Sequence, residues 1–160
     1  MGLFGNKDEI NVGLLKGQIR AICSRSFMGG SLDCDSDYNG GGSDTVIFAQ
    51  RYLPTPQMCN ALGNMDAVAI ASVTRYGSFT IELFCWDYVA EEKQRAFPQI
   101  ADTLEAKGYG VYYRNKGQSG SSTAYITITR DGSTKATWKD DLSKMFNDVS
   151  LYALRVLERY

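Results

Sequence analysis

The sequence of 160 residues contains no histidine. Histidine is the usual acid–base catalyst near neutral pH and the commonest metal ligand among the side chains. Its absence excludes serine–histidine and cysteine–histidine nucleophile pairs, and every metal site that needs an imidazole ligand. An enzyme made from this chain has to use carboxylates, Lys, Tyr, Cys or a metal held by oxygen ligands.

An excess of charge of one sign is also missing. The chain has 17 Lys and Arg against 18 Asp and Glu, which gives a net charge of −1. Proteins that bind nucleic acid usually carry a basic excess, because neutralising phosphates supplies much of their affinity. The charge balance leaves a local basic patch as the remaining route to nucleic acid.

Long hydrophobic runs are absent, since no stretch approaches the roughly 20 apolar residues of a membrane span. The N-terminus becomes charged at Lys7, which does not fit a signal peptide, so we predict no membrane association. The cysteines Cys23, Cys34, Cys59 and Cys85 form no C-x-x-C pair. We interpret them as free thiols of a cytoplasmic protein, with a disulfide among the first three as the alternative.

What the chain does contain predicts one α+β domain over residues 1–160. Hydrophobic residues make up 44% and charged residues 22%, as in an average globular domain. The hydrophobic periodicity predicts two successive β-β-α units: strands at 67–74 and 79–86 before a helix at 89–107, then strands at 109–114 and 123–130 before a helix at 137–160. Such units build a two-layer antiparallel sheet with helices packed mainly on one face. An N-terminal helix at 8–23 and a strand at 45–52 extend it.

The two long helices carry further detail. Pro98 predicts a kink, or a fresh helix start near Phe97, because proline disrupts a helix interior. The last helix has the clearest apolar stripe of the chain. Its members are Leu142, Met145, Phe146, Val149, Ala153, Val156, Leu157 and Tyr160.

A first candidate surface consists of apolar residues outside the predicted core. Leu151 and Leu154 lie off the main stripe of the last helix, and Tyr152 widens this second apolar side. Phe84 and Trp86 lie on the strand face opposite Leu83. A two-layer fold buries one face of its sheet, so a partner is expected to cover part of this set. The alternative is that the N-terminal segment buries the helix on both sides.

A second candidate is the hairpin at 109–130. The segment 107–113 is similar to the aromatic strand motif with which RNA-recognition domains stack bases, although it lacks one aromatic residue. The hairpin carries aromatic and basic side chains suited to a single strand or a nucleotide. They are Tyr109, Tyr112, Tyr113, Arg114, Lys116, Tyr125 and Arg130. The alternative is ordinary tyrosines on a half-exposed strand.

A third candidate is the glycine-rich, acidic segment 28–45, which we interpret as a loop. Five oxygen-bearing residues fall at positions 1, 3, 5, 7 and 12 of a calcium-loop template. They are Asp33, Asp35, Asp37, Asn39 and Asp44. Tyr38 stands where the template wants Gly, and Asp44 replaces the bidentate Glu. The alternative is a solvated loop, so calcium is the one cofactor that the sequence leaves open.

These observations favour a non-enzymatic protein that binds a protein partner or self-associates through its sheet face and last helix. A small accessory protein of a virus or mobile element fits the size and the lack of motifs. Binding of nucleic acid or a nucleotide by the hairpin at 109–130 is the alternative. A histidine-free enzyme is the third hypothesis, since Glu-x-Lys triplets at 91–93 and 105–107 occur in metal-dependent nucleases, but both fall on a predicted helix.

Overall fold

A computed structural model describes residues 9–26, 34–36, 45–50, 69–85, 87–120 and 123–160 of the chain. The described strands are β1 (Cys34–Ser36), β2 (Thr45–Gln50), β3 (Ala69–Thr74), β4 (Phe79–Cys85), β5 (Gly110–Arg114) and β6 (Ala124–Arg130). The described helices are α1 (Val12–Ser26), α3 (Asp87–Lys93), η3 (Gln94–Ala96), α4 (Phe97–Ala106), η4 (Gln118–Gly120), α5 (Trp138–Val149), η5 (Ser150–Leu154) and α6 (Arg155–Leu157).

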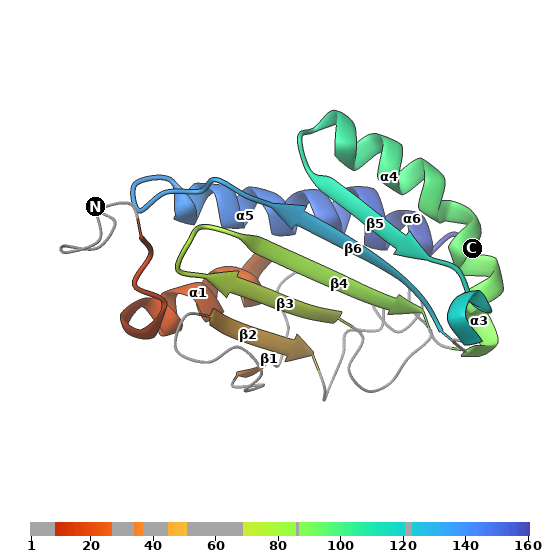
Figure 1. The fold of residues 1–160 in the computed structure, drawn as a ribbon, viewed down its shortest axis with the longest axis horizontal. Helices are drawn as coiled ribbons and strands as arrows, with labels where there is room; N and C mark the ends of the chain where they lie inside the picture. Colours follow the sequence, from red (N-terminus) through yellow and green to blue (C-terminus); the bar gives the residue numbers. More distant parts are fainter. Residues whose placement is uncertain (1–8, 27–33, 37–44, 51–68, 86, 121–122) are drawn as a thin grey trace.

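The described strands form one antiparallel sheet in the order β1-β2-β3-β4-β6-β5 (Figure 1). The two predicted hairpins, β3–β4 and β5–β6, are both present. They join through β4 and β6, so that β5 becomes the last strand on its side of the sheet. The predicted α+β class with an antiparallel sheet is therefore confirmed.

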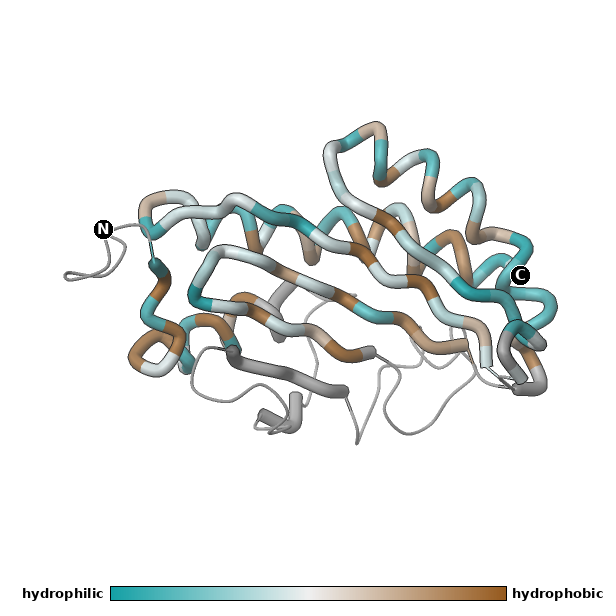
Figure 2. Tube along the Cα trace, viewed as in Figure 1, coloured by the Kyte–Doolittle hydropathy of each residue, from teal (hydrophilic) through white to brown (hydrophobic). Residues whose placement is uncertain are grey.

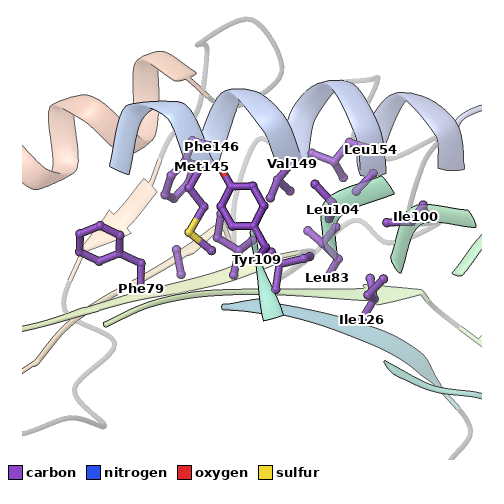
Figure 3. Packing of buried hydrophobic residues seen from close by; sticks show 14 of the residues in the cluster. Phe79, Leu83, Ile100, Leu104, Tyr109, Ile126, Met145, Phe146, Val149 and Leu154 are labelled. Carbon is purple, nitrogen blue, oxygen red and sulfur yellow. The ribbon is translucent and has the colours of Figure 1, made fainter. Parts of the chain in front are cut away.

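The long helices lie behind the sheet in Figure 1, and the core fills the space between the two layers. Buried and half-buried residues alternate along β4 and β6, because successive side chains of a strand point to opposite faces. Figure 2 shows hydrophobic and hydrophilic residues interspersed along these strands. Figure 3 shows Leu83 and Ile126 of the sheet facing Val149 of α5 and Leu104 of α4.

The helical segment after β4 is interrupted, as Pro98 predicted. α3 ends at Lys93, a short 3-10 turn follows, and α4 begins at Phe97 with Pro98 in its first turn. Proline is tolerated at this position because the first helical N–H groups have no intrahelical acceptor.

The last helix corrects one prediction. Its segment η5 is a π turn, which holds one more residue than an α turn. Within this segment Leu154 is 0% exposed beside the predicted stripe members Ala153 and Leu157, which are also buried, while Tyr160 is 44% exposed. The prediction that Leu154 lies off the buried stripe was therefore wrong.

The N-terminal part of the fold adds a helix and two strands. α1 packs beside α5 and against β2 and β3, with Ile19 and Ile22 buried and Leu14 exposed. β1 forms within the segment 28–45, so the loop prediction was wrong for Cys34–Ser36. No helix in the described ranges is both long enough and apolar enough to cross a membrane.

Two contacts join distant parts of the chain. At the β3–β4 turn, Gly77 has φ +80°, and its carbonyl accepts a hydrogen bond from the Ser133 backbone N–H at 3.2 Å. At the other end of the fold, the buried Lys93 Nζ donates to the backbone carbonyls of Leu157, at 2.7 Å, and Tyr160, at 2.6 Å. Lys93 thus binds the carbonyl end of the last helix, where the Leu157 carbonyl also accepts a hydrogen bond from the Tyr160 backbone N–H at 3.2 Å.

Candidate functional site

The face of the sheet opposite the helices, the open face, carries the strand side chains that the core does not use. On the strands β3 to β6 its members are Ile70, Ser72, Thr74, Thr80, Glu82, Phe84, Tyr112, Arg114, Tyr125, Thr127 and Thr129. Five of these eleven residues are Ser or Thr, as expected on a sheet face that meets water. A group of larger side chains interrupts this pattern at one end.

That group, which we call the aromatic–arginine cluster, consists of Phe84, Tyr112, Arg114 and Tyr125. Strand register brings it together, because Phe84 and Arg114 both pair with Tyr125 on β6, which lies between β4 and β5. The Tyr125 ring lies 5.9 Å from the Phe84 ring and 6.1 Å from the Tyr112 ring, centroid to centroid. These spacings are those of attractive tilted aromatic pairs.

Arg114 connects two of these rings. Its guanidinium carbon lies 5.8 Å from the centroid of the Tyr125 ring, within the range of a cation–π contact. Its Nη2 donates a hydrogen bond of 3.2 Å to the Tyr112 hydroxyl oxygen. This bond lowers the pKa of the Tyr112 hydroxyl and raises the pKa of Arg114, because it stabilises a phenolate beside the cation. Tyr112 remains 54% exposed, so the cluster is accessible to a partner.

Glu82 lies next to the cluster on β4, half-buried on the open face. Its carboxylate makes no ion pair with any residue that the structure describes, and Arg114 likewise has no carboxylate partner there. Two opposite charges therefore flank the aromatic rings without neutralising each other. Glu82 was not singled out from the sequence, although its alternation with Ile81 and Leu83 already indicated the open face.

Tyr109 belongs to the opposite face of the sheet. It is buried, and its hydroxyl donates a 2.6 Å hydrogen bond to the Asp148 carboxylate, which also pairs with Lys144 at 3.0 Å. Burial, together with this hydrogen bond, raises the pKa of the Tyr109 hydroxyl. Tyr109 ties the start of β5 to α5 and is not accessible to a base.

The remaining predicted hairpin residues also have partners within the chain. The Tyr113 ring packs on the Phe97 ring at 5.7 Å between centroids, on the core side. Arg130 Nη2 lies 3.0 Å from the Asp141 carboxylate. Lys116 Nζ lies 3.8 Å from the Glu91 carboxylate, and its backbone N–H donates to Gln94 Oε1. The structure thus divides the predicted hairpin set between its two faces.

The predicted surface on the last helix is reduced to one residue. Leu151 is 46% exposed, in agreement with its predicted position off the stripe. Tyr152 is half-buried, with the Lys107 ammonium 4.5 Å from its ring centroid. Trp86 lies outside the described residues. Leu151 by itself offers too little apolar area to resemble an interface.

The predicted calcium loop stays a prediction, because Asp33, Asp37, Asn39 and Asp44 lie outside the described residues. Asp35 falls in β1, where its backbone pairs with that of Ala49 in β2. No group of three or more potential ligands from His, Cys, Asp or Glu occurs among the residues that the structure describes.

Cys85 is a free thiol buried in the core. Burial raises its pKa from 9.0 to about 12, so the thiol is protonated at neutral pH. A buried thiol with a raised pKa is a poor nucleophile, which gives the enzyme hypothesis no support here.

Comparisons of this chain with models of protein families, with curated proteins and with solved structures found no match.

Proposed function

We propose that this protein binds a protein surface through the open face of its sheet, with the aromatic–arginine cluster at the centre of the contact. The observation that carries this proposal is the cluster itself, on a sheet face that the described helices leave uncovered. Tyr, Phe and Arg are enriched at the centres of protein interfaces, where few residues supply most of the binding energy. The Ser and Thr residues around the cluster suit a polar rim.

Nucleic acid is the rival partner, because Tyr112 and Tyr125 offer rings on which bases stack. The charges on the open face argue against it. Arg114 is the one cation among the open-face residues named above, and Glu82 is a carboxylate that repels phosphates. Arg130 and Lys116 have carboxylate partners elsewhere. Non-specific affinity for nucleic acid comes mainly from several phosphate contacts, which this surface does not supply.

The last helix is not part of the proposed surface. Since Leu154 is buried, Leu154→Asp tests folding and not binding. Leu151→Asp remains a fair test of the helix, and we expect it to leave binding through the open face unchanged.

Photo-crosslinking tests the proposal. A benzophenone amino acid replaces Tyr125 in the chain expressed in its native cells, and Tyr76 serves as the matched position because it is exposed at the β3–β4 turn, away from the cluster. We expect protein adducts at position 125 that are absent at position 76. Adducts with nucleic acid at position 125 overturn the proposal in favour of its rival. The same adducts at both positions, or none, refute it as well.

A further inference from the structure

The charges on the open face suit a second copy of the same chain. Arg114 and Glu82 are both half-buried, carry opposite charges, and find no ionic partner among the described residues. Partly desolvated charges favour an arrangement in which each meets an opposite charge. A second copy presents the same two charges at the same separation, so it can place an opposite charge against both Arg114 and Glu82.

Strand register fixes the relative positions of these charges. Glu82, Thr127 and Tyr112 form one row across β4, β6 and β5, and Phe84, Tyr125 and Arg114 form the next row. Glu82 and Arg114 therefore occupy one diagonal of this block, about 12 Å apart by strand geometry. Phe84 and Tyr112 occupy the other diagonal, and Tyr125 lies between the corners of its row.

A two-fold axis in the plane of the interface, perpendicular to the line between Glu82 and Arg114 at its midpoint, exchanges the two charged positions. Each Arg114 then lies over Glu82 of the second copy, and each Glu82 lies over the second Arg114. Phe84 and Tyr112 lie beside this axis, so each ring is near its own counterpart in the second copy and aromatic groups meet between the two ion pairs. This is the self-complementary pattern that an isologous dimer requires.

We propose that the open face binds a second copy of this chain, face to face, through two reciprocal Arg114–Glu82 ion pairs around the aromatic rings. This inference rests on the proposed function and names its partner. The footprint of four strands is roughly 400 Å² per copy from strand spacing and rise. A standard stable interface buries about 800 Å² per partner, so the dimer is weak and forms at micromolar or higher concentration.

Charge reversal tests the dimer in sedimentation equilibrium over a range of concentrations. In the wild type we expect a concentration-dependent dimer. Arg114→Glu alone, or Glu82→Arg alone, sets like charges against each other at both contacts, and each raises the dimer dissociation constant about tenfold or more. An equimolar mixture of the two variants restores the dimer, because every contact again joins Arg to Glu. Restoration on mixing also shows that both variants are folded.

The matched controls are Lys135→Glu, in the turn between β6 and α5, and Asp102→Arg, in α4, which change the net charge by the same amounts at exposed positions outside the strands of the open face. We expect each control to dimerise like the wild type. A wild-type chain that stays monomeric at several hundred micromolar overturns the inference, as do two variants that fail to recover on mixing.

Failure of this inference is distinct from failure of the proposed function. If the chain is monomeric but a different protein is crosslinked at position 125 and not at position 76, the second copy is the wrong partner and the open face is still a protein-binding surface. If position 125 gives no specific protein adduct either, both proposals fail.

Discussion

The two faces of strand β4 differ in how strongly packing within the fold restricts the residue at each position. On the helix side, Ile81, Leu83 and Cys85 are buried, and each contacts the packed core. On the open side, Thr80, Glu82 and Phe84 are only half-buried. A core position has to match the volume and shape of its neighbours, because protein interiors are close-packed. An open position has no such requirement, so a large aromatic or a charged residue there calls for another explanation.

The comparison applies to the tyrosines as well. Tyr109 is buried and Tyr113 packs on the core, and both are accounted for by contacts within the chain. Tyr112 and Tyr125 pack mainly on other members of the aromatic–arginine cluster. The open face thus carries the residues that folding explains least, and for that reason it is where binding is expected. Three pairs of variants and one single variant test how the packed side of the fold differs from its exposed parts.

The largest difference is expected between truncations on the two faces of β4. Leu83→Ala leaves a cavity in the core and lowers the free energy of unfolding by about 2–5 kcal/mol. Thr80→Ala, three residues away on the open face, lowers it by less than about 1 kcal/mol. Urea denaturation of both variants measures these losses. Equal losses contradict the assignment of the two faces.

A second pair compares two glycines with positive φ. Gly108 has φ +97° and free space around it, so Gly108→Ala costs about 1–2 kcal/mol for the backbone conformation alone. At Gly77 an added Cβ meets the Ser133 carbonyl oxygen at 1.9 Å, which forces the backbone to move. We expect Gly77→Ala to lower the melting temperature more than Gly108→Ala. A smaller loss at Gly77 argues against the contact between the turn and Ser133.

Tyr109→Phe and Tyr112→Phe each remove one hydroxyl group, the first on the core side of the sheet and the second on the open face. Tyr109→Phe deletes the buried hydrogen bond to Asp148 and lowers the free energy of unfolding by about 1–2 kcal/mol. Tyr112→Phe on the open face changes the free energy of unfolding by less than about 0.5 kcal/mol.

The pH dependence of stability distinguishes the two tyrosines further. Because the pKa of Tyr109 is raised in the folded state, its contribution is fully present below its ordinary value of 10.0 and is lost as the pH rises above it. Alkaline denaturation of Tyr109→Phe should lack this loss.

The smallest expected effect concerns acid stability. Burial raises the pKa of Asp141, but hydrogen bonds from Ser133, Thr137 and Arg130 outweigh it, and the net pKa is lowered from 3.8. A lowered carboxyl pKa stabilises the fold above 3.8, and this contribution is lost as the pH falls through the folded value. Asp141→Asn should therefore flatten the stability profile in this acid range. An unchanged profile contradicts the Arg130–Asp141 contact.

Much of the candidate site was predictable one residue at a time. The alternation of side chains in β4 identified its two faces, and it placed Phe84 opposite Leu83. Tyr112, Arg114 and Tyr125 were predicted as site residues because they are the aromatic and basic type of side chain that binds partners. Their separation from Tyr109, Tyr113 and Arg130 follows from strand alternation and pairing, which the sequence pattern did not resolve. Leu154 was misplaced because helical periodicity gives no warning of a π turn.

The sequence by itself determined the α+β class, the two hairpins, the break before α4 and the apolar stripe of α5, because these depend on local periodicity and on proline. The tertiary structure alone decided that β6 lies between β4 and β5, which brings Phe84, Tyr125 and Arg114 into one row. It also decided that Lys93 binds the carbonyl end of the last helix, more than 60 residues away along the chain. Strand order and such long-range contacts depend on which surfaces bury each other, and no local pattern encodes that choice.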